Sequence, residues 1–255
     1  MKSRLLLGDE AVAQAAMDAG ISTAYAYPGT PSTETFEYIE RIAPKALPHL
    51  HVSWCANEKV AYEAAMGTSF AGRRTVITMK HVGLNVAADP FMNSAMTGAD
   101  GGTVLMVADD PSMHSSQNEQ DSRYFADFAK LPCYEPANQQ EAYDMTRESF
   151  DASERFKLPV VLRIVTRLAH SRSRVVTQPA REPNPLALDA DKQRWTLLPT
   201  NSRRNYKALL AKQAALTEFS NESPWNDLVL TKNKKLGVIT AGVAYNYFRE
   251  VFAAD

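Results

Sequence analysis

The sequence has little cysteine, and this shortage excludes several kinds of site. Cys55 and Cys133 are the only cysteines among its 255 residues, and they form no CxxC pair. We therefore expect a cytoplasmic protein with two reduced thiols, the alternative being one disulfide between them. Two cysteines cannot hold a four-cysteine iron–sulfur cluster, so this chain alone carries no such cluster.

The sequence also lacks an excess of charge, long apolar runs and the common phosphate and zinc motifs. Its net charge is −1, so no basic surface for nucleic acid or anionic lipid is predicted. No apolar run approaches the roughly 20 residues of a membrane span. The acidic pair Asp9 and Glu10 follows the first leucines too closely for a secretory signal. GxxxxGK[ST], GxGxxG and HExxH are all missing, so no diphosphate cradle is predicted.

What the sequence does contain is a regular alternation of helical and strand-like patterns. Apolar residues make up 45% and charged residues 22%, as is usual for a globular protein. Short apolar strands joined by helices predict an α/β fold, with a parallel sheet and helices on both faces. The predicted strands are 22–27, 51–55, 75–79, 103–108 and 158–165, and the predicted helices are 11–19, 33–42, 58–70, 84–96 and 139–156.

The pattern changes at about residue 175, which we take as the end of a domain covering 1–174. Residues 175–234 are rich in proline and mixed charge at first and then include one amphipathic helix, so they are predicted to be a linker or surface strap. Residues 235–255 begin a new strand, turn and helix. One such unit cannot bury its own strand, so we expect the rest of a second α/β domain in a longer polypeptide or in a partner chain.

Two segments that follow predicted strands are expected to form a site. Tyr-Pro-Gly-Thr-Pro-Ser at 27–32 follows one strand, and Asn57 and Glu58 follow the next. Ligands collect where the carboxyl ends of parallel strands meet, so Thr30 and Glu58 should lie close together there. Glu58 has two interpretations: an acid/base carboxylate in an apolar environment, or a first-turn glutamate favoured by the helix dipole. The turn around Thr30 is either a substrate loop or an ordinary connection with a helix cap.

A long polar loop at 109–122 and the segment 80–85 extend the predicted site. Loops of this length in compact domains are often functional, and Arg123 at its end could bind a carboxylate or form a surface ion pair. Asp110 and His114 are spaced i, i+4, but no third ligand is defined, so we predict no metal site. Gly83 would let the backbone approach a ring that Asn85 could hydrogen-bond.

Together these segments resemble the N-terminal pyrimidine-binding domain of thiamine-diphosphate-dependent 2-oxoacid:ferredoxin oxidoreductases. The resemblance spans essentially the whole chain. Its most specific part is the polar loop, Asp-Asp-Pro-Ser-Met-His-Ser-Ser-Gln-Asn-Glu-Gln-Asp at 109–121. The other matching segments are Gly-Asp-Glu-Ala at 8–11, Tyr-Pro-Gly-Thr-Pro-Ser at 27–32, Asn-Glu-Lys at 57–59, and 235–240.

The resemblance implies a role for each candidate residue. Glu58 would be catalytic, because it matches the glutamate that hydrogen-bonds the aminopyrimidine ring and so activates the cofactor. The implied cofactor-binding residues are Glu58, Gly83, Asn85, Pro28 and Gly29, and the implied substrate-binding residues are Thr30, Arg123 and His114.

The resemblance also implies the reaction and the partners. The expected reaction is the oxidative decarboxylation of aryl pyruvates such as indolepyruvate to acyl-CoA, with ferredoxin as electron acceptor. The implied cofactor is thiamine diphosphate. Mg²⁺ and 4Fe-4S clusters belong to the family but have no ligands in this chain. A beta subunit, a second alpha copy, ferredoxin, CoA and the 2-oxoacid are the expected partners. The alternatives are a subunit of a non-oxidative thiamine-dependent decarboxylase and a non-catalytic assembly module.

Overall fold

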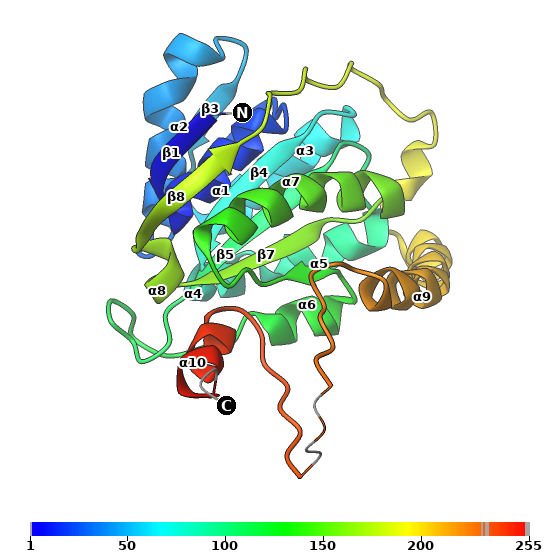
Figure 1. Ribbon diagram of the computed structural model, residues 1–255. Helices are drawn as coiled ribbons and strands as arrows, with labels where there is room; N and C mark the ends of the chain where they lie inside the picture. The colour runs from blue at the N-terminus through cyan, green and yellow to red at the C-terminus, as the bar shows by residue number, and fades with distance from the viewer. Residues whose placement is uncertain (1, 231, 233–234, 253–255) are drawn as a thin grey trace.

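The computed structural model describes residues 2–230, 232 and 235–252, and its centre is a six-stranded parallel sheet (Figure 1). The strand order is β3-β2-β4-β5-β7-β6, and every neighbouring pair is parallel. This confirms the predicted α/β class. The strands are β2 (Thr23–Ala26), β3 (His51–Trp54), β4 (Thr75–Lys80), β5 (Thr103–Asp109), β6 (Cys133–Tyr134) and β7 (Val160–Val165).

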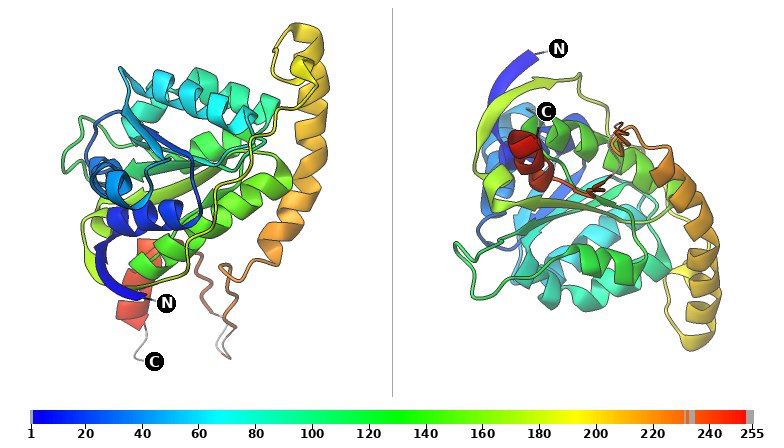
Figure 2. Two further views of the ribbon diagram at one scale, coloured as in Figure 1. Left: turned by 90° about the horizontal axis from the view of Figure 1, so that it is seen from above. Right: turned by 60° about the horizontal axis from the view of Figure 1, so that its bottom comes forward.

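Helices cover both faces of this sheet (Figure 2). On one face lie α1 (Gly8–Asp18), α2 (Thr33–Ala46) and α7 (Gln139–Phe156), and on the other lie α3 (Glu58–Phe70), α4 (His81–Val86), α5 (Ala88–Thr97) and α6 (Arg123–Ala129). The central strands β4 and β5 are buried along their whole length, as expected for strands covered on both sides.

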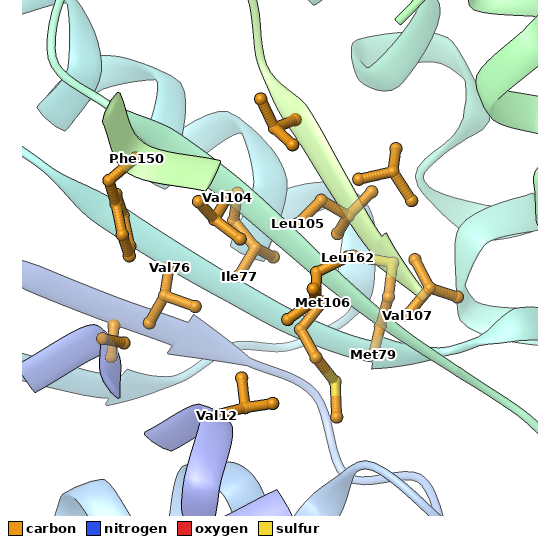
Figure 3. Close-up of a cluster of buried hydrophobic side chains, with 14 of the residues drawn as sticks. Val12, Val76, Ile77, Met79, Val104, Leu105, Met106, Val107, Phe150 and Leu162 are labelled. Atoms are coloured by element: carbon orange, nitrogen blue, oxygen red, sulfur yellow. The ribbon is translucent and has the colours of Figure 1, made fainter. Parts of the chain in front are cut away.

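The core lies between the sheet and its helices (Figure 3). Apolar side chains from β4, β5 and β7 meet side chains from α1 and α7, and each fully buried one stabilises the fold by about 1.5–3 kcal/mol. The residues labelled in this cluster are Val12, Val76, Ile77, Met79, Val104, Leu105, Met106, Val107, Phe150 and Leu162.

Two helices have the bounds predicted from the sequence, because each is capped by an asparagine. The Asn57 side chain accepts a hydrogen bond from the Val60 N–H (3.0 Å) at the start of α3. The Asn138 side chain accepts one from the Glu141 N–H (2.9 Å) at the start of α7. Such caps satisfy amide groups that a helix start leaves without partners.

The helix predicted over 84–96 is instead two helices, α4 and α5, which meet at Ala87. Pro90 explains the break, since it has no N–H to continue the helical ladder and is tolerated only in a first turn. The first of the two helices also starts earlier than predicted, at His81, directly after β4.

A second, two-stranded sheet was not predicted. β1 (Lys2–Leu7) pairs with β8 (Arg172–Thr177) in antiparallel register, Lys2 opposite Thr177. The short α8 (Thr166–Ala169) connects β7 to it. The domain boundary placed at residue 174 therefore falls inside β8. These strands carry exposed polar residues and a partner distant in sequence, so they lack the local apolar pattern of the central strands.

After β8 the chain crosses the amino-terminal edge of the parallel sheet as an extended strap, 178–189. The Arg181 N–H donates to the Asp18 carbonyl and the Ala187 N–H to the Ala71 carbonyl, both at 2.9 Å. A short 3₁₀ turn, η1 (Lys192–Arg194), and the long helix α9 (Pro199–Asn221) follow, and α9 packs beside α5 (Figure 2).

A strand is predicted at 235–240, but the structure shows no strand there. The described residues offer no neighbouring strand to pair with it, and an unpaired strand leaves its backbone groups unsatisfied. The helix α10 (Val243–Phe252) does follow. Arg167 Nε donates to the Tyr247 hydroxyl (2.7 Å), and the Asn246 side chain donates to the Ala137 carbonyl (2.6 Å). The second domain stays a prediction.

Within the described ranges, no helix combines the length and the apolar character that crossing a membrane requires.

Candidate functional site

Glu58 lies at the carboxyl end of β3, as the first residue of α3. Its side chain is buried, with 6% of the residue exposed. Among the residues that the structure describes, its carboxylate has no hydrogen bond and no ion pair. Burying a carboxylate without a partner costs several kcal/mol, so a native protein rarely keeps one without a ligand to bind. This position is therefore the centre of the candidate site.

Gly83 in α4 closes one side of Glu58. A Cβ added at Gly83 would lie 2.8 Å from Cγ and Cδ of Glu58 and nearer still to Oε1. Only glycine leaves that space, so the two predicted residues are in direct proximity. They come from the ends of β3 and β4, the two strands that flank β2 in the sheet.

The end of β2 supplies the turn that contains Thr30. The Ser32 N–H and hydroxyl both donate to the Gly29 carbonyl (2.8 and 2.7 Å), and the Gly29 N–H donates to Thr33 Oγ1 (2.9 Å). Thr30 precedes a cis proline and is exposed, as is Pro28. A Cβ on Gly29 would come within 2.9 Å of the Lys80 side chain, so this glycine also permits a close approach.

The polar loop folds over this end of the sheet, as predicted. The Ser115 hydroxyl donates to the Thr30 carbonyl (3.1 Å), and Asn85 donates to Gln120 (2.9 Å). His81 Nε2 donates to the Asn118 carbonyl at 3.1 Å. The loop thereby joins the turn after β2 to the helix after β4.

Asp110 fixes the start of this loop. It is fully buried, and its carboxylate accepts hydrogen bonds from the Ser115 N–H (2.8 Å) and the Thr166 hydroxyl (2.7 Å). Burial by itself would raise the pKa of Asp110, but these hydrogen bonds to the charged form outweigh it and hold the pKa well below its usual value. Asp110 is therefore a charged anchor, a role that its i, i+4 spacing to His114 did not suggest.

Arg123 lies in an ion-pair cluster instead of facing Glu58. Its guanidinium donates to Asp121 (2.6 Å from Nη2) and to Glu135 (3.2 Å), and Arg163 contacts the same two acids. The hydrogen bonds that Arg123 donates to Asp121 raise the pKa of Arg123. A substrate carboxylate would have to compete with Asp121 for this side chain, so the substrate-binding role of Arg123 stays a prediction.

The structure thus brings part of the predicted set together. Glu58 and Gly83 are adjacent, and the polar loop links them to Gly29, Thr30 and Asn85. The side chain of His114 is exposed and has no partner in the part of the chain that is described. Its predicted substrate contact remains untested.

Two residues of this region were missed or undervalued from the sequence. Lys80 is buried (8% exposed), contacts Gly29 and donates to the Ser115 carbonyl at 3.4 Å. His81 is 1% exposed, and its Nδ1 has no hydrogen-bond partner among the described residues. The available signal was their place at the carboxyl end of a strand whose other residues are uncharged.

Comparisons with known proteins identify the family of the chain. The family profile described as pyruvate flavodoxin/ferredoxin oxidoreductase, thiamine diP-bdg, matches residues 14–215. The indolepyruvate oxidoreductase subunit IorA of Thermococcus kodakarensis is 41% identical over 255 residues, covering 98% of this chain and 39% of the relative. The subunit of the same name from Archaeoglobus fulgidus is 43% identical over 249 residues, covering 96% and 40%. The chain therefore spans about two fifths of the length of these curated relatives.

More distant proteins share less sequence. The 2-oxoglutarate synthase subunit KorA of Methanocaldococcus jannaschii is 26% identical over 187 residues, which is 69% of this chain and 49% of that protein. A solved 2-oxoglutarate:ferredoxin oxidoreductase from Magnetococcus marinus matches with a TM-score of 0.73 at 15% identity, over 99% of this chain and 51% of that chain. This last likeness shows a shared fold.

Proposed function

Because the chain belongs to the thiamine diphosphate-binding family of pyruvate flavodoxin/ferredoxin oxidoreductases, we propose that it supplies the pyrimidine side of the cofactor site in a 2-oxoacid:ferredoxin oxidoreductase. One observation carries the proposal: a buried carboxylate, Glu58, has no partner in the described chain and faces a glycine whose missing side chain leaves room. The two free thiols, Cys55 and Cys133, favour a reducing, cytoplasmic compartment.

The residues around Glu58 fit an aminopyrimidine ring. A flat heterocycle with ring nitrogens needs a carboxyl group to exchange a proton with. Glu58 provides it, and the missing side chain of Gly83 leaves room for the Glu58 carboxylate to lie against α4. When bound, thiamine diphosphate supplies a nucleophilic carbon and an electron sink for loss of carbon dioxide from a 2-oxoacid.

The chain's own contribution is to hold a proton at one place. Glu58 begins α3, so its carboxylate lies at the positive end of a helix dipole and is kept near the sheet edge by the Asn57 cap. A hydrogen bond between a Glu58 carboxyl oxygen and a ring nitrogen would favour one tautomer of the ring. The polar loop and the turn at Thr30 cover the same edge and would exclude water from that bond.

The substrate and the partners are proposed from the relatives' names. The substrate would be an aryl pyruvate such as indolepyruvate, because the relatives at about 40% identity are indolepyruvate oxidoreductase subunits. The products would be an acyl-CoA and reduced ferredoxin. A beta subunit and a second copy of the alpha chain are proposed to complete the enzyme, and Mg²⁺ and 4Fe-4S clusters would be bound outside these 255 residues.

The test is the substitution Glu58→Gln in the assembled enzyme. Reduction of a low-potential dye is followed with indolepyruvate, CoA, Mg²⁺ and thiamine diphosphate. Loss of a positioned acid/base group should lower kcat by about 10²–10⁴-fold. Glu63→Gln is the matched control: it lies on the same helix, is half exposed and should leave kcat unchanged.

Other outcomes identify the alternatives. An assembled enzyme that releases aldehyde without dye reduction would indicate a non-oxidative decarboxylase. No turnover of indolepyruvate, phenylpyruvate, pyruvate or 2-oxoglutarate would indicate a non-catalytic module. Near-normal turnover by the Glu58→Gln enzyme would contradict the role given to this carboxylate.

A further inference from the structure

Three potential metal ligands meet on the side of the sheet covered by α1 and α2. Asp9 is in the first turn of α1, Glu34 is in the first turn of α2, and His170 follows α8. One ligand atom from each lies within 4.8 Å of the others, and His170 Nε2 is 3.4 Å from Glu34 Oε1. These residues are distant in sequence, so no local motif predicts the cluster.

The cluster contains buried oxygen atoms that have no hydrogen-bond partner in the part of the chain that the structure describes. Asp9 is 0% exposed, and neither of its carboxylate oxygens is satisfied. Glu34 Oε2 and Thr35 Oγ1 beside it are also buried without a partner. Two acids so close together need a cation or a proton between them.

We propose that Asp9, Glu34 and His170 bind a divalent first-row transition ion, for which Zn²⁺ is the best-suited example. Carboxylate oxygen and imidazole nitrogen are zinc ligands with bonds of about 2.0–2.2 Å, which in a tetrahedron places ligand atoms about 3.3–3.5 Å apart. The His170–Glu34 separation already has this value. The imidazole makes Mg²⁺ or Ca²⁺ unsuitable.

The exposure of the three residues would let a metal ion enter the site from solvent. The Glu34 and His170 side chains are 35% and 36% exposed, whereas Asp9 lies at the bottom of the cluster. Three protein ligands leave a fourth position for water. The ion would neutralise both acids and satisfy the Asp9 oxygens.

The proposed ion would connect three elements. It would tie the starts of α1 and α2 to the end of α8, and Glu34 is only four residues after Thr30. The turn at Thr30 would then be held both by the polar loop and, through Glu34, by the ion. The proposal is independent of the reaction assigned to Glu58, since it rests on different residues and a different measurement.

Calorimetric titration of the metal-free chain with Zn²⁺, and with Co²⁺ as a spectroscopic probe, tests the proposal. We expect one equivalent to bind, a tetrahedral Co²⁺ absorption spectrum, and a Tm that rises with Zn²⁺ concentration. Glu34→Gln and His170→Gln should each weaken Zn²⁺ binding at least tenfold. Both side chains are partly exposed, so these variants should fold.

Asp9→Asn is the third variant, and it keeps the shape of the side chain while removing the buried charge. It should also lose the zinc, without unfolding by circular dichroism. His49→Gln and Asp227→Asn, which replace an exposed histidine and an exposed aspartate, should bind like the parent chain. Absence of binding by the parent chain, or equal binding by all variants, would overturn the proposal. A proton shared between Asp9 and Glu34 would then be the remaining explanation.

Discussion

Buried charge is paired at the amino-terminal end of the parallel sheet, whereas at the carboxyl-terminal end only part of it is: Asp110 is hydrogen-bonded, and in the described chain Glu58 and Asp9 are not. At the amino-terminal edge, Arg74 is buried, and its Nε and Nη2 donate to Glu154, both at 2.8 Å, while its Nη1 donates to the Ala19 carbonyl (2.7 Å). At the carboxyl-terminal edge, Glu58 is 6% exposed and Asp9 is 0% exposed, and among the residues that the structure describes neither carboxylate has a hydrogen-bond partner, although only the Asp9 oxygens are fully buried. Burial of a charged side chain is thus common to both ends, and only the missing partner distinguishes a candidate ligand-binding group from a structural one.

The strap explains how the structural end is completed. Asn184 in the strap donates to Glu154 at 2.7 Å, and the Gly102 N–H donates to the same carboxylate at 3.3 Å. Every oxygen of Glu154 is therefore used. Burial alone would raise the pKa of Glu154, but the bonds from Arg74 and Asn184 outweigh it and lower the pKa.

Breaking the paired end should give the largest change in stability. Arg74→Met leaves Glu154 without its cation, and removing one partner of a buried pair costs about 3–5 kcal/mol. Glu58→Gln, at the other end, should not lower the free energy of unfolding and should raise it, since it removes a buried charge that has no partner. Urea unfolding of the two variants measures the difference.

A double variant checks the cause. In Arg74→Met/Glu154→Leu no charge is left unpaired, so a large part of the lost stability should return. If Glu58→Gln proved as damaging as Arg74→Met, the contrast between the two ends would be wrong.

Replacing Asp110 should have a medium effect on the free energy of unfolding. Asp110→Asn keeps the shape but replaces a charged acceptor, and hydrogen bonds to charged groups contribute about 1.5–3 kcal/mol. Because the pKa of folded Asp110 lies below its unfolded value, its contribution is fully present above about pH 4 and is lost as the pH falls toward the folded pKa.

Unfolding measured from pH 7 down to pH 2 should therefore show a difference between parent chain and Asp110→Asn that narrows in acid. Limited proteolysis at pH 7 should cut the polar loop faster in the variant. A difference that stayed constant with pH would contradict the charged anchor.

Two glycine substitutions should have the smallest effects on stability and the clearest contrast. Gly67 is in α3 with open space where a Cβ would be, so Gly67→Ala should stabilise the helix by about 0.5–1 kcal/mol. Gly83→Ala should gain nothing, since its Cβ would push against Glu58. Thermal unfolding separates the two, and in the assembled enzyme only Gly83→Ala should lower kcat. Equal behaviour would argue against close contact at Gly83.

The parallel sheet was predictable because each of its main strands carries its own signal. Runs such as 75–79 and 103–108 are apolar and bounded by turns, and asparagine caps set the starts of α3 and α7. The pair β1–β8 and the edge strand β6 were missed, because their pairing depends on residues far away or on very short segments. The resemblance drawn from the motifs at 27–32, 57–59 and 109–121 is confirmed at the level of the family.

The candidate site was predictable only where residues follow strands directly. Strand ends meet at one edge whatever the details, so Glu58, Gly83 and the Thr30 turn could be placed together. The ion pairs of Arg123 and the burial of Lys80 depend on how the polar loop folds, which local sequence does not determine. The cluster of Asp9, Glu34 and His170 needs the packing of three separate elements.

The β1–β8 pair has a consequence for the connectivity of the chain. Since Lys2 lies opposite Thr177, the start of the first strand, β1, is next to the end of the last strand of the α/β unit, β8 (Figure 1). Adjacent ends of this kind allow a domain to be circularly permuted. A short peptide joining these ends, with new termini opened elsewhere on the surface, should preserve the order of the strands in space while changing their order along the gene.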